Sequence, residues 1–230
     1  MDAGHAPGTY GRIAHVPPRW SPDGRRLAFV VAEGDVSRAG DGTYAIVVTG
    51  VFDEERQRLT RTVSAPAWSP DGTRVAFARA SQDGVGLYTI RPDGTDVRIL
   101  TRIERWAASR TDGHLARVWV RNLAWSPDGE HLLYTWDDRV HVVNVDGSTR
   151  SWRLPGQGAE PAAAWSPDGS RIAVALSYEV SYDQPSRASN ASTGRVVLYT
   201  TAADGSDRRD LVLKTPGGRL AAAGTSDGAG

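Results

Sequence analysis

The sequence predicts an all-β fold, a β-propeller of four-stranded antiparallel blades, from three observations. The pentapeptide WSPDG occurs four times in 230 residues, beginning at Trp20, Trp68, Trp125 and Trp165. Short apolar runs of strand length follow each copy, and no segment shows the periodicity of a helix. Four-stranded units that repeat around an axis are typical of propeller blades, whereas a β-sandwich would not repeat one pentapeptide at the same hairpin.

Each predicted blade contains four strands, a to d, in chain order. Strand a ends at the tryptophan of PPRW, APAW, NLAW or AAAW, and strand b is RRLAFVV, TRVAFAR, EHLLYTW or SRIAVAL. Strand c is YAIVV, GLYTI, VHVVNV or RVVLYT, and strand d is QRLT, VRILT, SWRL or DLVL. In three of the units a second turn signal, RPDGTD, NVDGST or AADGSD, joins strand c to strand d.

The pentapeptide itself predicts the hairpin between strands a and b. Ser, Pro, Asp and Gly suit the four positions of a type I turn, because Pro fixes φ at the second position and Gly accepts a left-handed conformation at the fourth. The Trp ends strand a, where its ring can fill the wedge between neighbouring blades. A metal bound by a ring of four aspartates is excluded because the copies lie in separate blades. We assign a structural turn or wedge role to Trp20, Asp23, Gly24, Trp68, Asp71, Gly72, Trp125, Asp128, Gly129, Trp165, Asp168 and Gly169.

These units resemble the TolB-like, or WD-repeat-like, β-propeller repeat, and the match runs from about His15 to Leu213. The resemblance implies an architecture rather than one function, since the family includes periplasmic scaffold proteins, propeller domains of serine peptidases, sensor ectodomains and some lyases. Blade 1 departs from the pattern, because TGVFDEER replaces its Asp-Gly turn. It also has Arg19 at the position of Ala67, Ala124 and Ala164.

The predicted domain organisation is an N-terminal extension (1–14), a propeller (15–213) and a Gly/Ala-rich tail (214–230) that we expect to be disordered. The blades span about 15–60, 61–101, 115–154 and 159–213. Propellers of the TolB type usually have about six blades. Three arrangements therefore remain open: a closed ring of four blades, which we favour because alanines suit a crowded axis, an arc of a larger ring, or an arc completed by a second copy.

Composition narrows the classes of partner. The 27 basic residues balance the 27 acidic ones, so no net field attracts nucleic acid or an anionic membrane surface. There is no cysteine, and no apolar stretch is long enough to insert into a membrane. As written, the chain is expected in the cytoplasm, or in the periplasm or outside the cell if it is a trimmed fragment. Lysine is represented by Lys214 alone, a bias towards arginine that suggests a bacterial source.

The predicted binding face is the one that carries the long connections. The a–b and c–d hairpins lie on one face of a propeller, and the b–c and d–a connections lie on the other. Here the second kind holds the long segments 32–43, 102–117 and 177–194, and long connections in compact domains are usually functional or disordered. The binding candidates at this rim and at the channel mouth are Arg19, Glu104, Arg105, Trp106, Arg110, His114, Tyr178, Tyr182 and Asp183.

The sequence does not predict a catalytic set. It has no G-x-S-x-G nucleophile motif, its histidines lack close metal-ligand spacing, and the DGTD and DGSD turns supply too few oxygens for calcium. We therefore expect a non-enzymatic scaffold that binds a protein or peptide, without cofactor or metal. The alternative is a small-ligand-binding protein or an enzyme of lyase or hydrolase type, with its site at the mouth of the central channel.

Overall fold

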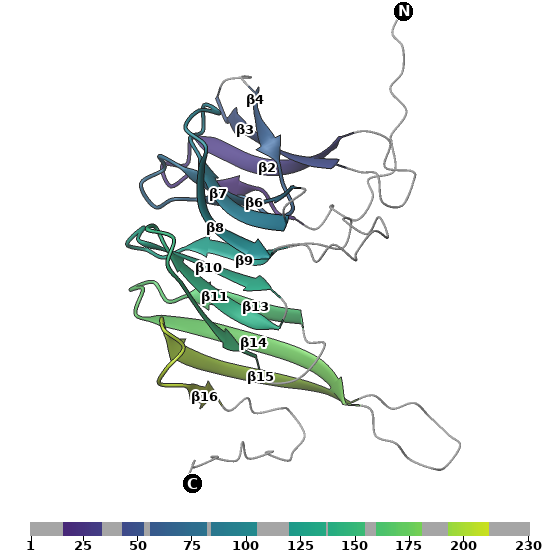
Figure 1. Ribbon diagram of the computed structural model, residues 1–230, viewed down its shortest axis with the longest axis vertical. Helices are drawn as coiled ribbons and strands as arrows, with labels where there is room; N and C mark the ends of the chain where they lie inside the picture. Colours follow the sequence, from purple (N-terminus) through teal and green to yellow (C-terminus); the bar gives the residue numbers. More distant parts are fainter. Residues whose placement is uncertain are drawn as a thin grey trace, which may run out of the picture.

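The computed structural model describes residues 16–33, 43–52, 56–81, 84–104, 120–136, 138–154, 160–180 and 193–211. These residues form strands and turns, arranged as four antiparallel sheets of four strands each. The all-β fold class and the four blades predicted from the sequence are thereby confirmed (Figure 1). None of the described segments forms a helix with the length and hydrophobicity that crossing a membrane requires.

Each sheet is one blade, and its strands pair in chain order. Blade 1 contains β1 (Arg19–Trp20), β2 (Arg26–Glu33), β3 (Thr43–Gly50) and β4 (Arg56–Arg61). Blade 2 contains β5 (Ala67–Trp68), β6 (Val75–Ser81), β7 (Gly84–Ile90) and β8 (Arg98–Glu104). Blade 3 contains β9 (Arg121–Trp125), β10 (His131–Trp136), β11 (Arg139–Asn144) and β12 (Thr149–Arg153). Blade 4 contains β13 (Glu160–Trp165), β14 (Arg171–Val180), β15 (Thr193–Ala202) and β16 (Arg209–Leu211).

The WSPDG segments form the tight turns between the first and second strands. In blade 1 the amide of Gly24 donates to the carbonyl of Ser21 at 2.9 Å, and Gly24 has a φ of 69°. The Ser21 hydroxyl donates to Asp23 Oδ1 at 2.5 Å and accepts from the Arg26 amide at 2.9 Å. The other three copies repeat these bonds, so the serine and aspartate close the turn internally.

The apolar core lies between blades rather than within one sheet. Three clusters of buried residues join blade 1 to blade 2, blade 2 to blade 3 and blade 3 to blade 4. Phe77, Tyr134 and Tyr199 each lie almost fully buried in one of these clusters. A single four-stranded sheet buries its apolar side chains only when it stacks on a neighbouring sheet.

Tryptophans of the repeat take part in this stacking. The indole Nε1 of Trp68 donates to the carbonyl of Arg19 in blade 1 at 3.0 Å, and that of Trp125 donates to the carbonyl of Ala67 in blade 2 at 3.1 Å. Trp68 is 8% exposed, whereas Trp20 in blade 1 is 57% exposed. The difference follows from position, since blade 1 is the first of the row.

The four blades form an open row. Blade 1 lies at one end of the long axis and blade 4 at the other (Figure 1), so the closed ring of four blades that we favoured is not formed. Of the alanines on which that expectation rested, Ala67 belongs to the core between blades 2 and 3, whereas Ala164 is exposed. An alanine before the tryptophan therefore does not indicate a narrow axis.

Candidate functional site

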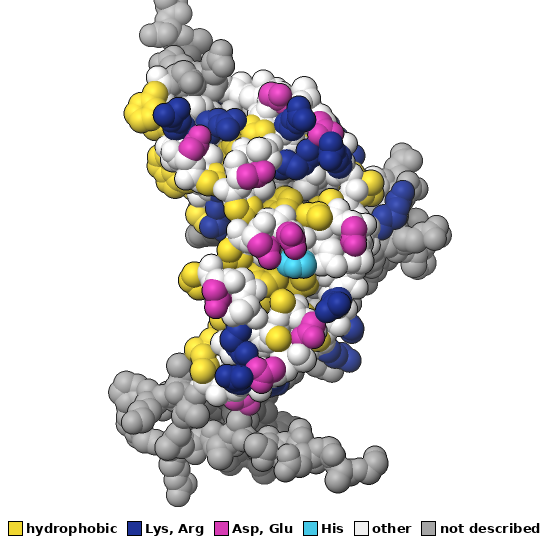
Figure 2. Space-filling view, turned by 90° about the vertical axis from the view of Figure 1, so that its left-hand side faces the viewer, with side chains coloured by type: hydrophobic (Ala, Val, Ile, Leu, Met, Phe, Trp, Pro, Cys, Tyr) yellow, Lys and Arg dark blue, Asp and Glu magenta, His cyan; other side chains and the backbone are white. Residues whose placement is uncertain are grey.

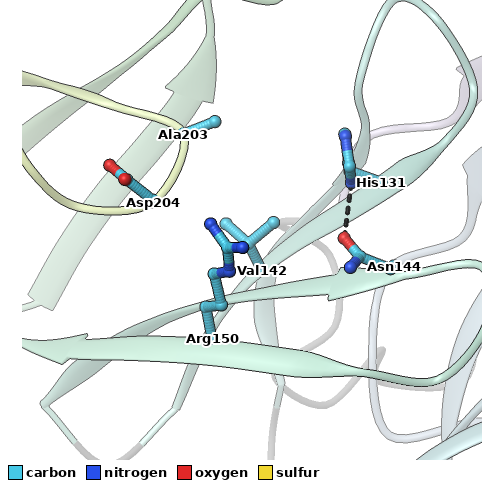
Figure 3. A pocket seen from close by; sticks show the side chains of 6 residues that line it. All are labelled: His131, Val142, Asn144, Arg150, Ala203 and Asp204. Atoms are coloured by element: carbon cyan, nitrogen blue, oxygen red, sulfur yellow. Dashed lines mark hydrogen bonds between the residues drawn. The ribbon is translucent and has the colours of Figure 1, made fainter.

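A groove opens between blades 3 and 4 on the face that carries the tight turns, here called the turn face. Figure 2 looks onto this face, where basic and acidic side chains lie around patches of apolar ones. The groove has a volume of about 310 Å³. Its lining comes from blade 3 and from the turn between β15 and β16 (Figure 3), and consists of His131, Val142, Asn144, Arg150, Ala203 and Asp204.

His131 is held in place from three sides. Its backbone amide and carbonyl bond to Ser126 in the tight turn, at the start of β10. Its Nδ1 lies 2.7 Å from Asn144 Oδ1, and Asn144 Nδ2 in turn donates to the Ser148 hydroxyl at 2.6 Å. The imidazole also stacks on Trp165 of blade 4, with ring centroids 6.2 Å apart. These contacts orient the histidine at the seam between the two blades.

Opposite charges line the groove. Arg150 projects from β12, and Asp204 lies on the turn of blade 4 (Figure 3). Hydrogen bonds from Ser206 hold the pKa of the Asp204 carboxyl below its usual value, and the charge of Arg150 adds to this effect. Val142 also lines the groove, which therefore offers a cation, an anion and an apolar contact. Such a set suits a short peptide better than a purely apolar ligand.

One group of side chains at the edge of the groove could hold a metal ion. Ligand atoms of Asp128, Glu130 and His131 lie within 4.8 Å of one another. Asp128 Oδ1, however, already accepts from the Ser126 hydroxyl and the Glu130 amide, and these bonds lower the pKa of its carboxyl. The position and ionisation of the Asp128 carboxylate therefore follow from its hydrogen bonds in the turn and do not require a metal ion. We had not predicted this grouping, although the run Asp-Gly-Glu-His contains the signal.

Few of the candidates predicted from the sequence fall within the described residues. Arg19 lies exposed in β1, Glu104 ends β8, and Tyr178 lies in β14. The others lie outside the described residues: Arg105, Trp106, Arg110, His114, Tyr182 and Asp183. Their convergence on one rim stays a prediction. The groove residues, by contrast, were not predicted from the sequence.

Comparison with known proteins supports the architecture. Residues 107–144 match the model of the WD domain, G-beta repeat. No curated protein shows significant sequence similarity to the chain. The fold is similar to that of TolB from Acinetobacter baumannii, with a TM-score of 0.52 and 19% identity over 84% of this chain.

Two archaeal structures are similar to the same extent. The β-propeller domain of the Trilobed protease from Pyrococcus furiosus has a TM-score of 0.56 and 14% identity over 86% of this chain. The acylaminoacyl peptidase of Pyrococcus horikoshii has a TM-score of 0.53 and 15% identity over 85%. The chain spans 42% of TolB, 57% of the Trilobed protease domain and 31% of the peptidase. The resemblance to TolB-like and WD-repeat-like propellers is confirmed as a likeness of repeat and fold.

Proposed function

Taking this TolB-like, WD-repeat-like propeller as the premise, we propose that the chain is a non-enzymatic scaffold that binds a protein or peptide partner. The partner contacts the face opposite the turn face, here called the loop face. Binding residues often lie on loops that a rigid scaffold holds in place, because the sequence of a loop can vary without disturbing the sheets.

The observation that carries this proposal is the unequal length of the connections. Each tight turn links the first and second strands of its blade through a few residues, such as those between Trp20 and Arg26. On the loop face the chain takes residues 34–42 to pass from β2 to β3, 105–120 from β8 to β9, and 181–192 from β14 to β15. The second and third of these connections have a dozen residues or more, a length that is uncommon in compact domains unless the segment serves a function or is disordered.

The chemistry of the longest connection fits protein recognition. It carries Arg105, Trp106 and Arg110 within six residues of sequence. Tryptophan and arginine are the residue types that most often dominate the energy of protein interfaces. The groove on the turn face is the competing site, because Arg150 and Asp204 could bind the backbone and side chains of a peptide.

Selection from a displayed library of random linear peptides, followed by affinity measurement on variants, tests the proposal. Trp106→Ala is expected to weaken the selected peptides by at least about tenfold, in line with loss of an interface anchor. Arg150→Glu, the matched variant on the turn face, is expected to leave the affinity unchanged. If Arg150→Glu abolishes binding and Trp106→Ala has no effect, the loop face is not the binding face.

The alternative of an enzyme or small-ligand site at the mouth of a central channel requires blades that close around an axis. One copy, as an open row of four blades, does not enclose such a channel in its described part (Figure 1), so this alternative depends on further blades that complete a ring. The scaffold proposal makes no such demand, because the loop face exists in the open row.

A further inference from the structure

The contact between one blade and the next follows a repeated rule. Each blade has an outgoing face, which packs on the next blade, and an incoming face, which packs on the blade before. Between blades 1 and 2 the outgoing face contributes Ala28, Ile46 and Val48, and the incoming face contributes Trp68, Val75, Phe77 and Ile90. The outgoing Ala76, Ala78 and Leu87 of blade 2 meet the incoming Leu132 and Tyr134 of blade 3 in the same way.

The tight turns repeat the rule with the proline and glycine of WSPDG. A methyl group placed on Gly72 would lie 3.6 Å from Cδ of Pro22 in the preceding blade. The corresponding distances are 3.6 Å from Gly129 to Pro70 and 3.4 Å from Gly169 to Pro127. At all three interfaces between neighbouring blades, the glycine of one WSPDG turn therefore lies against the proline of the WSPDG turn in the preceding blade. Gly24 has no described neighbour at this position, where a methyl group would meet nothing within 4 Å.

In blades 1 and 3, the second residue after the glycine of WSPDG faces the tryptophan of the next blade. Arg26 lies 5.2 Å from the ring centroid of Trp68, and the His131 ring stacks on Trp165. A cation above an indole is attracted to the face of the ring. Arg171 holds this position in blade 4, where the described residues contain no following blade.

The outgoing face of blade 4 matches that of blade 2 residue by residue. The paired strands place Ala164, Ala173, Ala175 and Leu198 where blade 2 has Ala67, Ala76, Ala78 and Leu87. The arginine behind the face is matched as well: Arg171 bonds Thr200 and Asp207 as Arg74 bonds Thr89 and Asp96. The blade 2 residues are buried under blade 3, whereas Ala164 is exposed and Ala173, Ala175 and Leu198 are only partly buried.

The incoming face of blade 1 matches that of blade 3. Trp20 pairs with Leu27 as Trp125 pairs with Leu132, and Phe29 takes the place of Tyr134. The core between blades 2 and 3 shows what such a face packs on, because Leu132 and Tyr134 lie against an outgoing face that blade 4 duplicates. The two open ends of the row are thus complementary copies of an interface that the chain already makes internally.

Exposed apolar side chains also lie at the two ends of the row. The turn between the third and fourth strands of a blade sits on the fourth strand of the blade before, as Gly147 does on the carbonyl of Leu100. At that position in blade 1 lies Phe52, which is 88% exposed, and the fourth strand of blade 4 carries Leu211, which is 47% exposed. Ile99 and Val145 of the middle blades are 49% and 52% exposed, so Phe52 is the side chain whose exposure stands out and indicates a contact surface.

We propose that blade 4 of one copy of this chain docks on blade 1 of a second copy, and that two copies close into one ring through two identical contacts. In each contact the Trp20 indole donates to the Ala164 carbonyl of the other copy, and Gly24 receives Pro167. A head-to-tail contact forms either a closed ring or a filament. Two copies give twice four blades, which lies within the range of about four to eight that propellers adopt.

Light scattering coupled to size-exclusion chromatography tests this assembly on the full chain. The expected mass is that of two copies. Trp20→Ala and Ala175→Arg are each expected to reduce it to one copy, because the first removes the incoming wedge and the second places a charge on the outgoing face. Ile99→Ala, which removes an apolar side chain of blade 2 that is 49% exposed, is expected to retain two copies.

The far-ultraviolet circular dichroism of each variant shows whether the single copy stays folded. If Ala175→Arg does not fold, the mass of Trp20→Ala alone decides the result. A wild-type mass of one copy from nanomolar to micromolar concentration would overturn the proposal. So would a two-copy mass that survives both end-face substitutions, since the copies would then be joined through another surface.

Discussion

Trp125 of blade 3 donates its indole N–H to the carbonyl oxygen of Ala67 in blade 2 over 3.1 Å. Trp68 makes the same bond to Arg19 over 3.0 Å. The chain places a wedge-shaped ring and a directed hydrogen bond at one point, so the bond fixes the register of neighbouring blades while the ring fills the space between them. By this pattern Trp165 would donate to Ala124, yet among the described residues its buried Nε1 has no hydrogen-bond partner.

This difference predicts opposite effects for one substitution at two equivalent sites. Trp125→Phe leaves the Ala67 carbonyl without its donor, so the free energy of unfolding should fall by about 1 to 3 kcal/mol. Trp165→Phe removes a buried donor that has no partner, and should be neutral or stabilising. Urea unfolding followed by circular dichroism measures both. Equal losses at the two sites would show that ring size, rather than the indole hydrogen bond, decides the effect.

The blades could be predicted because their signal is local. A type I turn needs only the residues within it, and WSPDG marks that turn four times. Whether the blades close could not be predicted, because closure depends on the angle at which side chains such as Ala78 and Tyr134 pack across an interface. The turn-face groove was missed for a related reason: Asn144 and Asp204 are sixty residues apart in sequence and lie together only once blades 3 and 4 stack.

Two glycines of equivalent turns should differ in their tolerance of alanine. Gly94 has a φ of 84° and Gly147 a φ of 89°, so alanine at either position adopts a left-handed conformation at a cost of about 1 to 2 kcal/mol. A Cβ on Gly94 would meet the mobile end of the Gln57 side chain at 3.1 Å, whereas a Cβ on Gly147 would lie 2.6 Å from the Leu100 backbone oxygen.

Gly147→Ala should therefore reduce the free energy of unfolding by at least about 1 kcal/mol more than Gly94→Ala, because a backbone oxygen cannot move aside without shifting a strand. Thermal unfolding of the two variants under one set of conditions measures the difference. Indistinguishable midpoints would indicate that the turn of blade 3 is not seated on blade 2 as closely as the structure places it.

The aspartate of the blade 4 turn should make folding sensitive to acid. Hydrogen bonds from Ser166, and then from the amide and hydroxyl of Ser170, lower the pKa of Asp168 from 3.8 to about 2. Because the folded pKa is depressed, the ionised carboxylate stabilises the fold above pH 3.8, and this contribution is lost as the pH falls from 3.8 towards about 2.

Carboxyl carbon NMR titration checks this pKa directly. Ser166→Ala should raise the pKa of Asp168 more than Ser170→Ala does, since the Ser166 hydroxyl is the larger cause of the shift. A larger rise in Ser170→Ala would mean that the carboxylate is held mainly by the residue after the turn.

Hydrogen exchange of the indole N–H groups tests whether the WSPDG tryptophans are buried between neighbouring blades, and whether Trp20 is buried against blade 4 of a second copy. Single Trp→Phe variants assign each signal. We expect slow exchange at Trp68 and Trp125 in both the wild type and Ala175→Arg. Trp20 should be slow in the wild type, where a second copy covers it, and fast in Ala175→Arg, where it stays 57% exposed. Equally fast exchange at Trp20 in both proteins, or exchange at Trp68 and Trp125 as fast as at Trp20 in Ala175→Arg, would contradict this expectation.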